Sequence, residues 1–225
     1  MLAIDMHVHS HYSVDGLSTP MELLKTAKKK EIGFAVTEHN NADSMAVFKK
    51  MNKWFHVPLI LGQEQKLWHE GDFVGELLFY FLQEPIESKD LFTAIDQAKK
   101  QDAIISVAHP YDVCRKPLFF GFRKLELVKK HLNAVEVFNA RVYFNSVNKR
   151  AEQFALANNL SFAAGSDAHT AKELGNAVTV CNASSLEEFR KCLKKQKTYY
   201  DGKLSGPFVH LHSTFAQLGI LKPKI

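Results

Sequence analysis

The sequence predicts an α/β fold, and within that class a single-domain (β/α) barrel of the TIM-barrel-like type. Segments with strand and helix patterns alternate about seven times over the 225 residues, which favours parallel strands joined by helical crossovers. Clusters of His, Asp and Glu follow nearly every predicted strand. The loops after the strands of a barrel converge on one site, whereas an open doubly wound sheet, the alternative, uses only the loops near its switch point.

The N-terminal half begins with a predicted strand over residues 1–9. Thr19 and Pro20 then start a helix that runs to about Lys30, because Thr is a preferred N-cap and Pro fits the first turn. Periodicity predicts further strands over 32–38, 58–64 and 73–82 and helices over 43–55 and 88–101, with Ser88 as N-cap of the last. Gly71-Asp72 marks a turn.

The C-terminal half continues the alternation. It contains predicted strands over 103–108, 134–138, 160–164 and 177–181, helices over 122–131, 145–158 and 184–195, and a loop over 111–121. The tail after Gly202 has no clear pattern and is interpreted as a capping segment. We therefore expect one domain over 1–225, with a motif-bearing core over 1–181 and a C-terminal helix and tail over 184–225.

Composition indicates a soluble, cytoplasmic globular protein. Hydrophobic residues make up 46% and charged residues 24% of the chain. No apolar run reaches the roughly 18 residues that span a membrane, and Asp5 interrupts the N-terminal run before a secretory signal could form. The three cysteines form no CxxC pair, which suits a reducing compartment. The net charge of +5 comes largely from helix-face lysines, so it suits anionic substrates without arguing for nucleic acid.

Two histidines at the end of the first predicted strand point to a metal. His7 and His9 are two residues apart, so their side chains project from the same face of the strand. Two imidazoles directed at one point can bind a transition metal, although two ordinary strand-end histidines are the simpler alternative. Similar clusters at the other strand ends favour the metal.

The candidate ligands are all nitrogen or oxygen donors. In chain order they are His7, His9, Asp15, His39, Glu64, His109, Asp167 and His169. Imidazole and carboxylate without thiolate suit Zn, Mn or Fe. Eight groups exceed one tetrahedral shell, so the economical interpretation is a site of two or three metals with bridging carboxylates. Hydrolysis of phosphate esters often uses such a bridged metal pair.

Together, these motifs resemble the series found in the PHP superfamily, named for polymerases and histidinol phosphatases. The resemblance rests on Asp5-Met6-His7-Val8-His9-Ser10, Asp15-Gly16, Glu38-His39-Asn40, Gly62-Gln63-Glu64, Ala108-His109-Pro110 and Gly165-Ser166-Asp167-Ala168-His169. It extends from about Met1 to about Val180. It implies a distorted (β/α)7 barrel that holds up to three divalent metals and usually acts as a phosphoesterase.

The resemblance also implies how the ligands are shared among the metals. One metal would lie among His7, His9, Glu64 and Asp167, a second would be held by Glu64 and His109 with Glu64 bridging, and a third by Asp15, His39 and His169.

The sequence departs from the family pattern at two places. Glu38 stands where the family usually has Asp, and no His occurs in Gly75-Glu76-Leu77-Leu78-Phe79, where many members carry a ligand. A subset of the family has Gly-Glu at this position, so Glu76 is the expected replacement ligand and His69 the weaker alternative.

Residues beyond the ligands are expected to support them or to contact substrate. Glu136 and Glu38 are predicted to orient ligands. Asn139 and the arginines Arg115 and Arg141 are predicted to contact an anionic substrate, because the planar guanidinium matches phosphate oxygens. The alternative for both arginines is surface solvation or a structural ion pair.

The mechanism that these expectations favour is attack of metal-activated hydroxide on a small phosphomonoester or nucleotide. Asp15, His39 and His169 are the predicted catalytic residues, with a protonated His39 or His169 assisting the leaving group if it binds no metal. Three alternatives stay open: a nuclease for short or single-stranded nucleic acid, a non-catalytic metal-binding domain, and a hydrolase of C–N bonds. The last often needs a carboxylated lysine, and no lysine lies at such a strand end.

Overall fold

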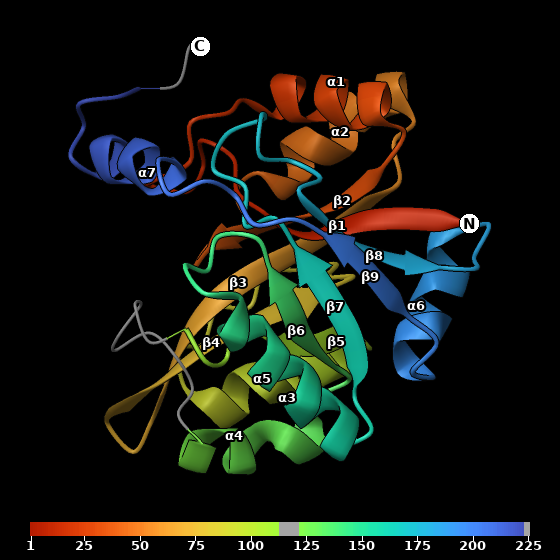
Figure 1. Ribbon diagram of the computed structural model, residues 1–225, viewed down its shortest axis with the longest axis vertical. Helices are drawn as coiled ribbons and strands as arrows, with labels where there is room; N and C mark the ends of the chain where they lie inside the picture. Colours follow the sequence, from red (N-terminus) through yellow and green to blue (C-terminus); the bar gives the residue numbers. More distant parts are fainter. Residues whose placement is uncertain (113–121, 223–225) are drawn as a thin grey trace.

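One sheet, nearly closed into a barrel, organises the chain and confirms the predicted fold class (Figure 1). The computed structural model describes residues 1–112 and 122–222. Within them the strands are β1 (Leu2–Val8), β2 (Gly33–His39), β3 (Leu59–His69), β4 (Asp72–Tyr80), β5 (Ile104–Val107), β6 (Ala134–Asn139), β7 (Ser161–Gly165), β8 (Ala177–Cys181) and β9 (Tyr199–Gly202). Their order in the sheet is β7-β6-β5-β4-β3-β2-β1-β8-β9.

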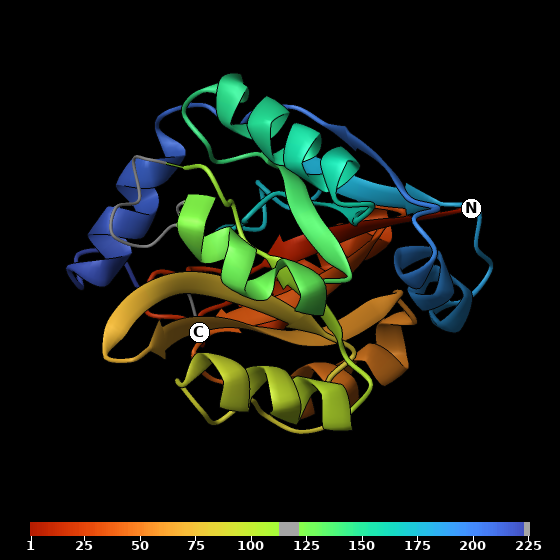
Figure 2. The same cartoon turned by 90° about the horizontal axis from the view of Figure 1, so that it is seen from below.

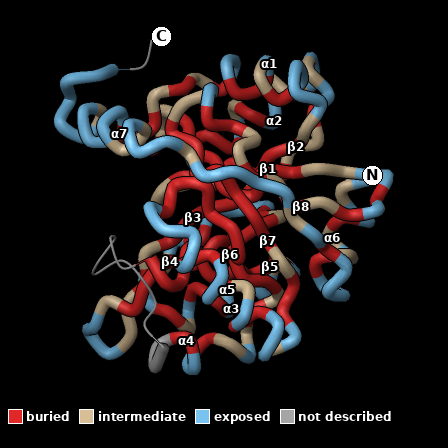
Figure 3. The backbone as a smooth tube through the Cα atoms, viewed as in Figure 1, coloured by how far each residue is buried: buried red, intermediate tan, exposed pale blue. Residues whose placement is uncertain are grey.

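Helices pack around the sheet, and the buried core fills the barrel and the spaces between the sheet and the surrounding helices (Figures 2 and 3). They are α1 (Pro20–Lys30), α2 (Met45–Phe55), α3 (Leu91–Lys100), α4 (Phe122–Val128), α5 (Asn145–Ala157), α6 (Leu186–Lys194) and α7 (Val209–Gln217), with a short 3-10 helix, η2 (Lys129–His131). Helix α1 begins with the predicted cap, a capping box between Thr19 and Glu22. The predicted N-cap Ser88 is wrong: α3 is capped by Asp90, whose carboxylate accepts from the Thr93 amide.

Strand β4 runs antiparallel to both of its neighbours, unlike the all-parallel pattern expected from sequence. The turn at Glu70 and Gly71, with φ angles of 52° and 87°, is too short for anything but a hairpin between β3 and β4. The remaining strands from β1 to β7 pair in parallel. The reversal places Glu76 in the middle of a strand, opposite Lys66 of β3, rather than after a strand end.

The barrel closes where the chain after β7 meets the end of β1. Val8 and Ala168 form a parallel bridge, and the His9 amide donates to the Ala168 carbonyl at 2.9 Å. Gly165 allows this approach, because a Cβ there would lie 2.3 Å from the His7 Cβ and 2.7 Å from the His7 backbone nitrogen. The closure brings His7 of β1, and His9 just after it, beside Asp167.

Replacing Gly165 with Ala is therefore expected to destabilise the fold. Forcing atoms into such a contact costs about 1–3 kcal/mol, or roughly 2–12 °C in the melting temperature of a domain of this size. Gly206→Ala is the control, since its Cβ would meet no heavy atom within 4 Å and should change stability by less than about 0.5 kcal/mol. Thermal melts of both variants test this, and equal melting temperatures would contradict the close approach.

The tail contains structure that the sequence did not indicate. Residues 199–202 add β9 to the sheet, with Tyr200 packed on Phe138, and α7 follows beyond it. Cys181 of β8 and Cys192 of α6 are joined by a disulfide, so the cysteines do not support the reducing compartment that their spacing favoured. Cys114 lies outside the described residues. No helix among the described residues has the length and apolar character needed to cross a membrane.

Candidate metal centre

The fold brings the predicted ligands together at the carboxyl end of the barrel. His7 lies in β1, His39 at the end of β2, and Glu64 in β3, while the others come from the loops after β1, β5 and β7 and from β4. All are buried except His39, which is partly exposed. The clustered residues are His7, His9, Asp15, His39, Glu64, Glu76, His109, Asp167 and His169.

The first group has His7 and His9 facing two carboxylates. The Nε2 atom of His7 lies 3.4 Å from Glu64 Oε1 and 3.8 Å from Asp167 Oδ1. The Nε2 atom of His9 lies 3.6 Å from Glu64 Oε2 and 3.4 Å from Asp167 Oδ1. Neither Nε2 atom has a hydrogen-bond partner within the described part of the chain, although both are buried. Buried nitrogens that face carboxylates across such gaps suit a shared cation.

The second group is centred on Glu64, which is shared between groups. His109 Nε2 lies 3.2 Å from Glu64 Oε1 and 3.6 Å from Glu76 Oε2, and His39 Nδ1 lies 2.7 Å from Glu64 Oε2. Burial and then the Glu64 carboxylate raise the pKa of Glu76 to about 7. A bound cation would hold both carboxylates ionised, so Glu76 occupies a position in which a metal ligand fits.

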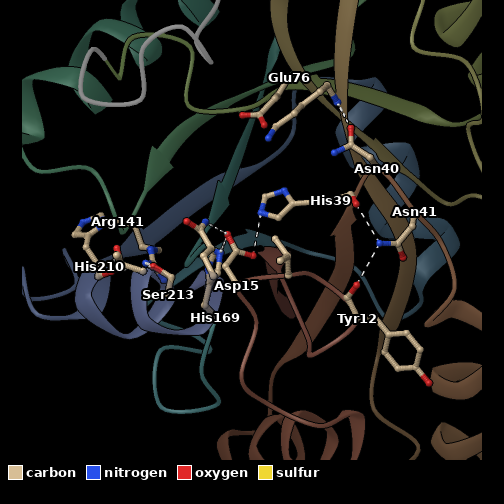
Figure 4. A pocket seen from close by; sticks show the side chains of 14 residues that line it. Tyr12, Asp15, His39, Asn40, Asn41, Glu76, Arg141, His169, His210 and Ser213 are labelled. Carbon is tan, nitrogen blue, oxygen red and sulfur yellow. Dashed lines mark hydrogen bonds and ion pairs between the residues drawn. The ribbon is translucent and has the colours of Figure 1, made fainter. Parts of the chain in front are cut away.

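The third group joins Asp15 to two histidines (Figure 4). Asp15 Oδ1 lies 3.4 Å from His39 Nε2, and Asp15 Oδ2 lies 3.2 Å from His169 Nε2. Burial opposes ionisation of Asp15, but His169 and His39 outweigh it and hold its pKa well below the usual range. His9, His39 and His169 also have nitrogen atoms within 4.8 Å of one another. His39 therefore contacts both the second and the third group, and Glu76 joins the second, so the groups in the structure overlap more than the family resemblance implies.

The donor set is chemically suited to transition metals. Burial, and then the neighbouring His39, lower the pKa of His9 to about 3, so its imidazole is neutral and keeps a lone pair for a metal. Burial opposes protonation of His7, but Glu136, Glu64 and Asp167 raise its pKa well above the usual range. A metal at the Nε2 atom of His7 would take the place of that proton.

Glu136, predicted to orient ligands, contacts two of the candidate ligands. Its Oε1 lies 2.8 Å from His7 Nδ1, and its Oε2 accepts from the His109 amide at 2.7 Å. With Nδ1 of His7 donating to this carboxylate, the lone pair of His7 is at Nε2, on the side of the metal centre. Asn139, predicted to bind substrate, instead donates from its amide to Glu136 at 3.1 Å and Asp167 at 3.2 Å.

Glu38 supports the opposite side of the centre through two serines. Its carboxylate accepts from the Ser10 hydroxyl and from the Ser13 hydroxyl, the latter at 2.5 Å. Ser13 Oγ lies 3.3 Å from His9 Nδ1 and accepts from the His39 amide at 3.0 Å. Glu38 is longer than the usual Asp by one methylene, and it reaches the ligands through Ser13 rather than directly.

The remaining predicted residues lie apart from the ligands. Arg141 forms a buried ion pair with Glu173 at 3.0 Å and donates to α7, so its guanidinium is engaged although it borders the pocket. His69 packs edge-on against Phe92, with ring centroids 5.0 Å apart, and is not part of the cluster. Arg115 lies outside the described residues.

A cavity of about 650 Å³ opens beside the third group (Figure 4). Asp15, His39 and His169 lie on its inner side, and its walls come from β3, β4, the loops after β1, β2 and β6, and helix α7. The wall residues include Tyr12, Asn40, Asn41, Lys66, His210 and Ser213. The polar lining suits a small hydrophilic ligand that reaches the candidate metal ligands.

Sequence reasoning missed three residues at this site. Asp5 is buried two positions before His7, where it accepts from the Ser166 amide at 2.8 Å and from the Ser166 hydroxyl. Two of these residues could have been found from spacing. Asp5 precedes His7 by two residues and Lys66 follows Glu64 by two residues, so each shares a strand face with a candidate ligand. Gln217, which donates to Asp15 at 3.0 Å, had no signal because it is 202 residues away.

Comparison with known sequences places these motifs in a family. A model described as PHP domain matches residues 5–143, and a second, described as PHP-associated, matches residues 145–198. An uncharacterized protein of Methanocaldococcus jannaschii is 33% identical over 190 residues, which cover 83% of this chain and 73% of that protein.

Comparison with solved structures shows the same fold. A two-domain protein from Bacteroides vulgatus containing a predicted PHP-like metal-dependent phosphoesterase has a TM-score of 0.75 at 23% identity, covering 90% of this chain and 65% of that one. The chain thus spans less than two thirds of the two-domain protein. An amidohydrolase from Chromobacterium violaceum, with bound sulfate, has a TM-score of 0.62 at 14% identity over 84% of this chain and 96% of that one.

Proposed function

Because the chain belongs to the PHP family, we propose that it is a metal-dependent hydrolase that cleaves small phosphoesters. The observation that carries the proposal is the convergence of nitrogen and oxygen donors around Glu64, next to a polar cavity. The phosphoesterase named in the Bacteroides vulgatus protein supports the same reaction class. The donor set favours two or three ions of Zn, Mn or Fe.

Different residues of the chain would have different roles at such a site. Bound divalent ions would lower the pKa of water and take up charge on the phosphoryl oxygens. Glu64 would be shared between two ions, because both of its oxygens face histidines. Asp15, His39 and His169 border the cavity, so they are the groups that meet the reacting atoms. In this proposal, whichever of His39 and His169 binds no ion is the proton donor to the leaving group, because both line the cavity.

We assign Lys66 as the cationic residue that binds the anionic substrate. Its position two residues after Glu64 in β3 places it on the same face, and it lines the cavity opposite Glu76. It forms no ion pair with the described residues, whereas Arg141 is held by Glu173. An ammonium group in the wall of this cavity suits the negative charge of a phosphoester.

Replacing Lys66 with Ala is expected to raise KM at least tenfold with little change in kcat. A hydrogen bond to a charged group contributes about 1.5–3 kcal/mol, and the substrate makes this contact before and during the reaction. Lys66→Arg, which keeps the charge, should recover most of the affinity. Steady-state kinetics on the preferred substrate check this, and an unchanged KM in Lys66→Ala would remove Lys66 from substrate binding.

The function itself is tested with the protein re-loaded with Mn, Zn or Fe. Phosphate release is measured from a panel of phosphomonoesters and nucleotides, in parallel with cleavage of short single-stranded oligonucleotides and of amides. Release from a small phosphoester supports the proposal. Cleavage of oligonucleotides alone would indicate a nuclease, and cleavage of amides alone would indicate the C–N chemistry that the name of the Chromobacterium violaceum protein suggests. A metal-loaded protein inactive on all three would contradict the proposed hydrolase.

A further inference from the structure

Helix α7 contacts the barrel through polar groups at the site and through stacking of its His210 ring on Tyr143, with ring centroids 4.3 Å apart. Within α7 only Ser213 is buried, and Phe208 and Leu218, which flank the helix, are 74% and 66% exposed (Figure 3). The Arg141 guanidinium donates to Ser213 Oγ at 2.7 Å and to the Val209 carbonyl at 3.2 Å. The helix therefore depends for its position on residues at the mouth of the metal centre.

The last residue of α7 reaches a candidate metal ligand directly. Gln217 Nε2 donates to Asp15 Oδ2 at 3.0 Å, on the oxygen that also lies 3.2 Å from His169 Nε2. The other oxygen, Asp15 Oδ1, is buried and has no hydrogen-bond partner within the described residues. The neutral Gln217 amide thus fixes the plane of the Asp15 carboxylate. It leaves Asp15 Oδ1 directed at His39 Nε2, which is 3.4 Å away.

We propose that Gln217 is a positioning residue for Asp15, so that the C-terminal helix completes the third group of the metal centre. The inference rests on the proposed metal binding. Hydrogen bonds to ligating carboxylates orient them, and their loss typically weakens metal binding about 10–100-fold. Coupling between two sites is reciprocal, so if docking of α7 strengthens metal binding at Asp15, metal binding must strengthen docking of α7.

The first test is metal affinity measured without substrate. Gln217→Ala and the control Thr214→Ala are compared with wild type by titration with Mn²⁺ and Zn²⁺. Thr214 lines the same cavity, but its hydroxyl donates to His210 of its own helix at 2.9 Å. One ion is expected to bind about 10–100-fold more weakly in Gln217→Ala and unchanged in Thr214→Ala. Equal affinities in Gln217→Ala and wild type would overturn the proposal.

The second test measures the stability of helix α7 instead of metal affinity. Hydrogen exchange of the amides of α7 is measured with and without bound Mn²⁺ in both proteins. Metal should slow exchange in wild type and have a clearly smaller effect in Gln217→Ala, whereas exchange that ignores metal in wild type would contradict the coupling. Neither test uses turnover, so a protein that binds metal but cleaves no phosphoester would refute the proposed function and leave this inference standing.

Discussion

Replacing His9 with alanine is expected to lower kcat/KM for phosphate release by more than about 100-fold. His9 Nε2 faces Glu64 and Asp167, and its ring also lies next to His39 and His169, so its loss affects two of the three groups. Loss of a residue that only supports a ligand costs about 10–100-fold, so loss of a ligand shared in this way should cost more. Steady-state kinetics after re-loading with metal measure the effect, and circular dichroism confirms folding.

The chain provides a matched control for this substitution. His69 lies at the end of β3, against Phe92 and outside the cluster, so His69→Ala should keep wild-type turnover and metal content. Asp167→Ala should behave like His9→Ala, because Asp167 faces both His7 and His9. A folded His9→Ala protein with wild-type kcat/KM would show that the first group takes no part in the reaction.

Metal binding is also expected to raise the melting temperature by about 8–16 °C. A ligand present at a thousandfold excess over its Kd stabilises the native state by about 4 kcal/mol, and a domain of this size gains roughly 2–4 °C per kcal/mol. The physical source is at the site, where buried atoms such as His7 Nε2 and Asp15 Oδ1 lack hydrogen bonds within the described residues.

Thermal melts with saturating Mn²⁺ and after chelation measure this shift. His9→Ala should show a smaller metal-induced shift than wild type, while His69→Ala should show the full shift. Identical melting temperatures for wild type with metal and with chelator would mean that the buried cluster binds no ion.

The parts of the site that the sequence revealed are those where local pattern sets geometry. His7 and His9 share a strand face, and Asp167 and His169 follow a strand with the same spacing, so barrel topology alone directs them to one place. The capping box of Thr19 and Glu22 was visible for the same reason, because it depends only on neighbours in the chain.

The parts that sequence reasoning missed depend on contacts between distant segments. Arg141 was expected to face substrate, but its partners Glu173 and Ser213 are 32 and 72 residues away. Gln217 meets Asp15 only because α7 folds back over the barrel mouth (Figure 1). Glu76 was found through the family resemblance, since the hairpin of β3 and β4 that places it opposite Lys66 breaks the barrel pattern.

The most direct test of the account is the metal content of the purified protein, measured by elemental analysis before and after re-loading with Mn, Fe and Zn. The geometry of the three groups around Glu64 predicts about two or three ions per chain, and fewer in His9→Ala. A folded wild-type chain that binds none of these metals after re-loading would contradict the metal centre and the hydrolase built on it.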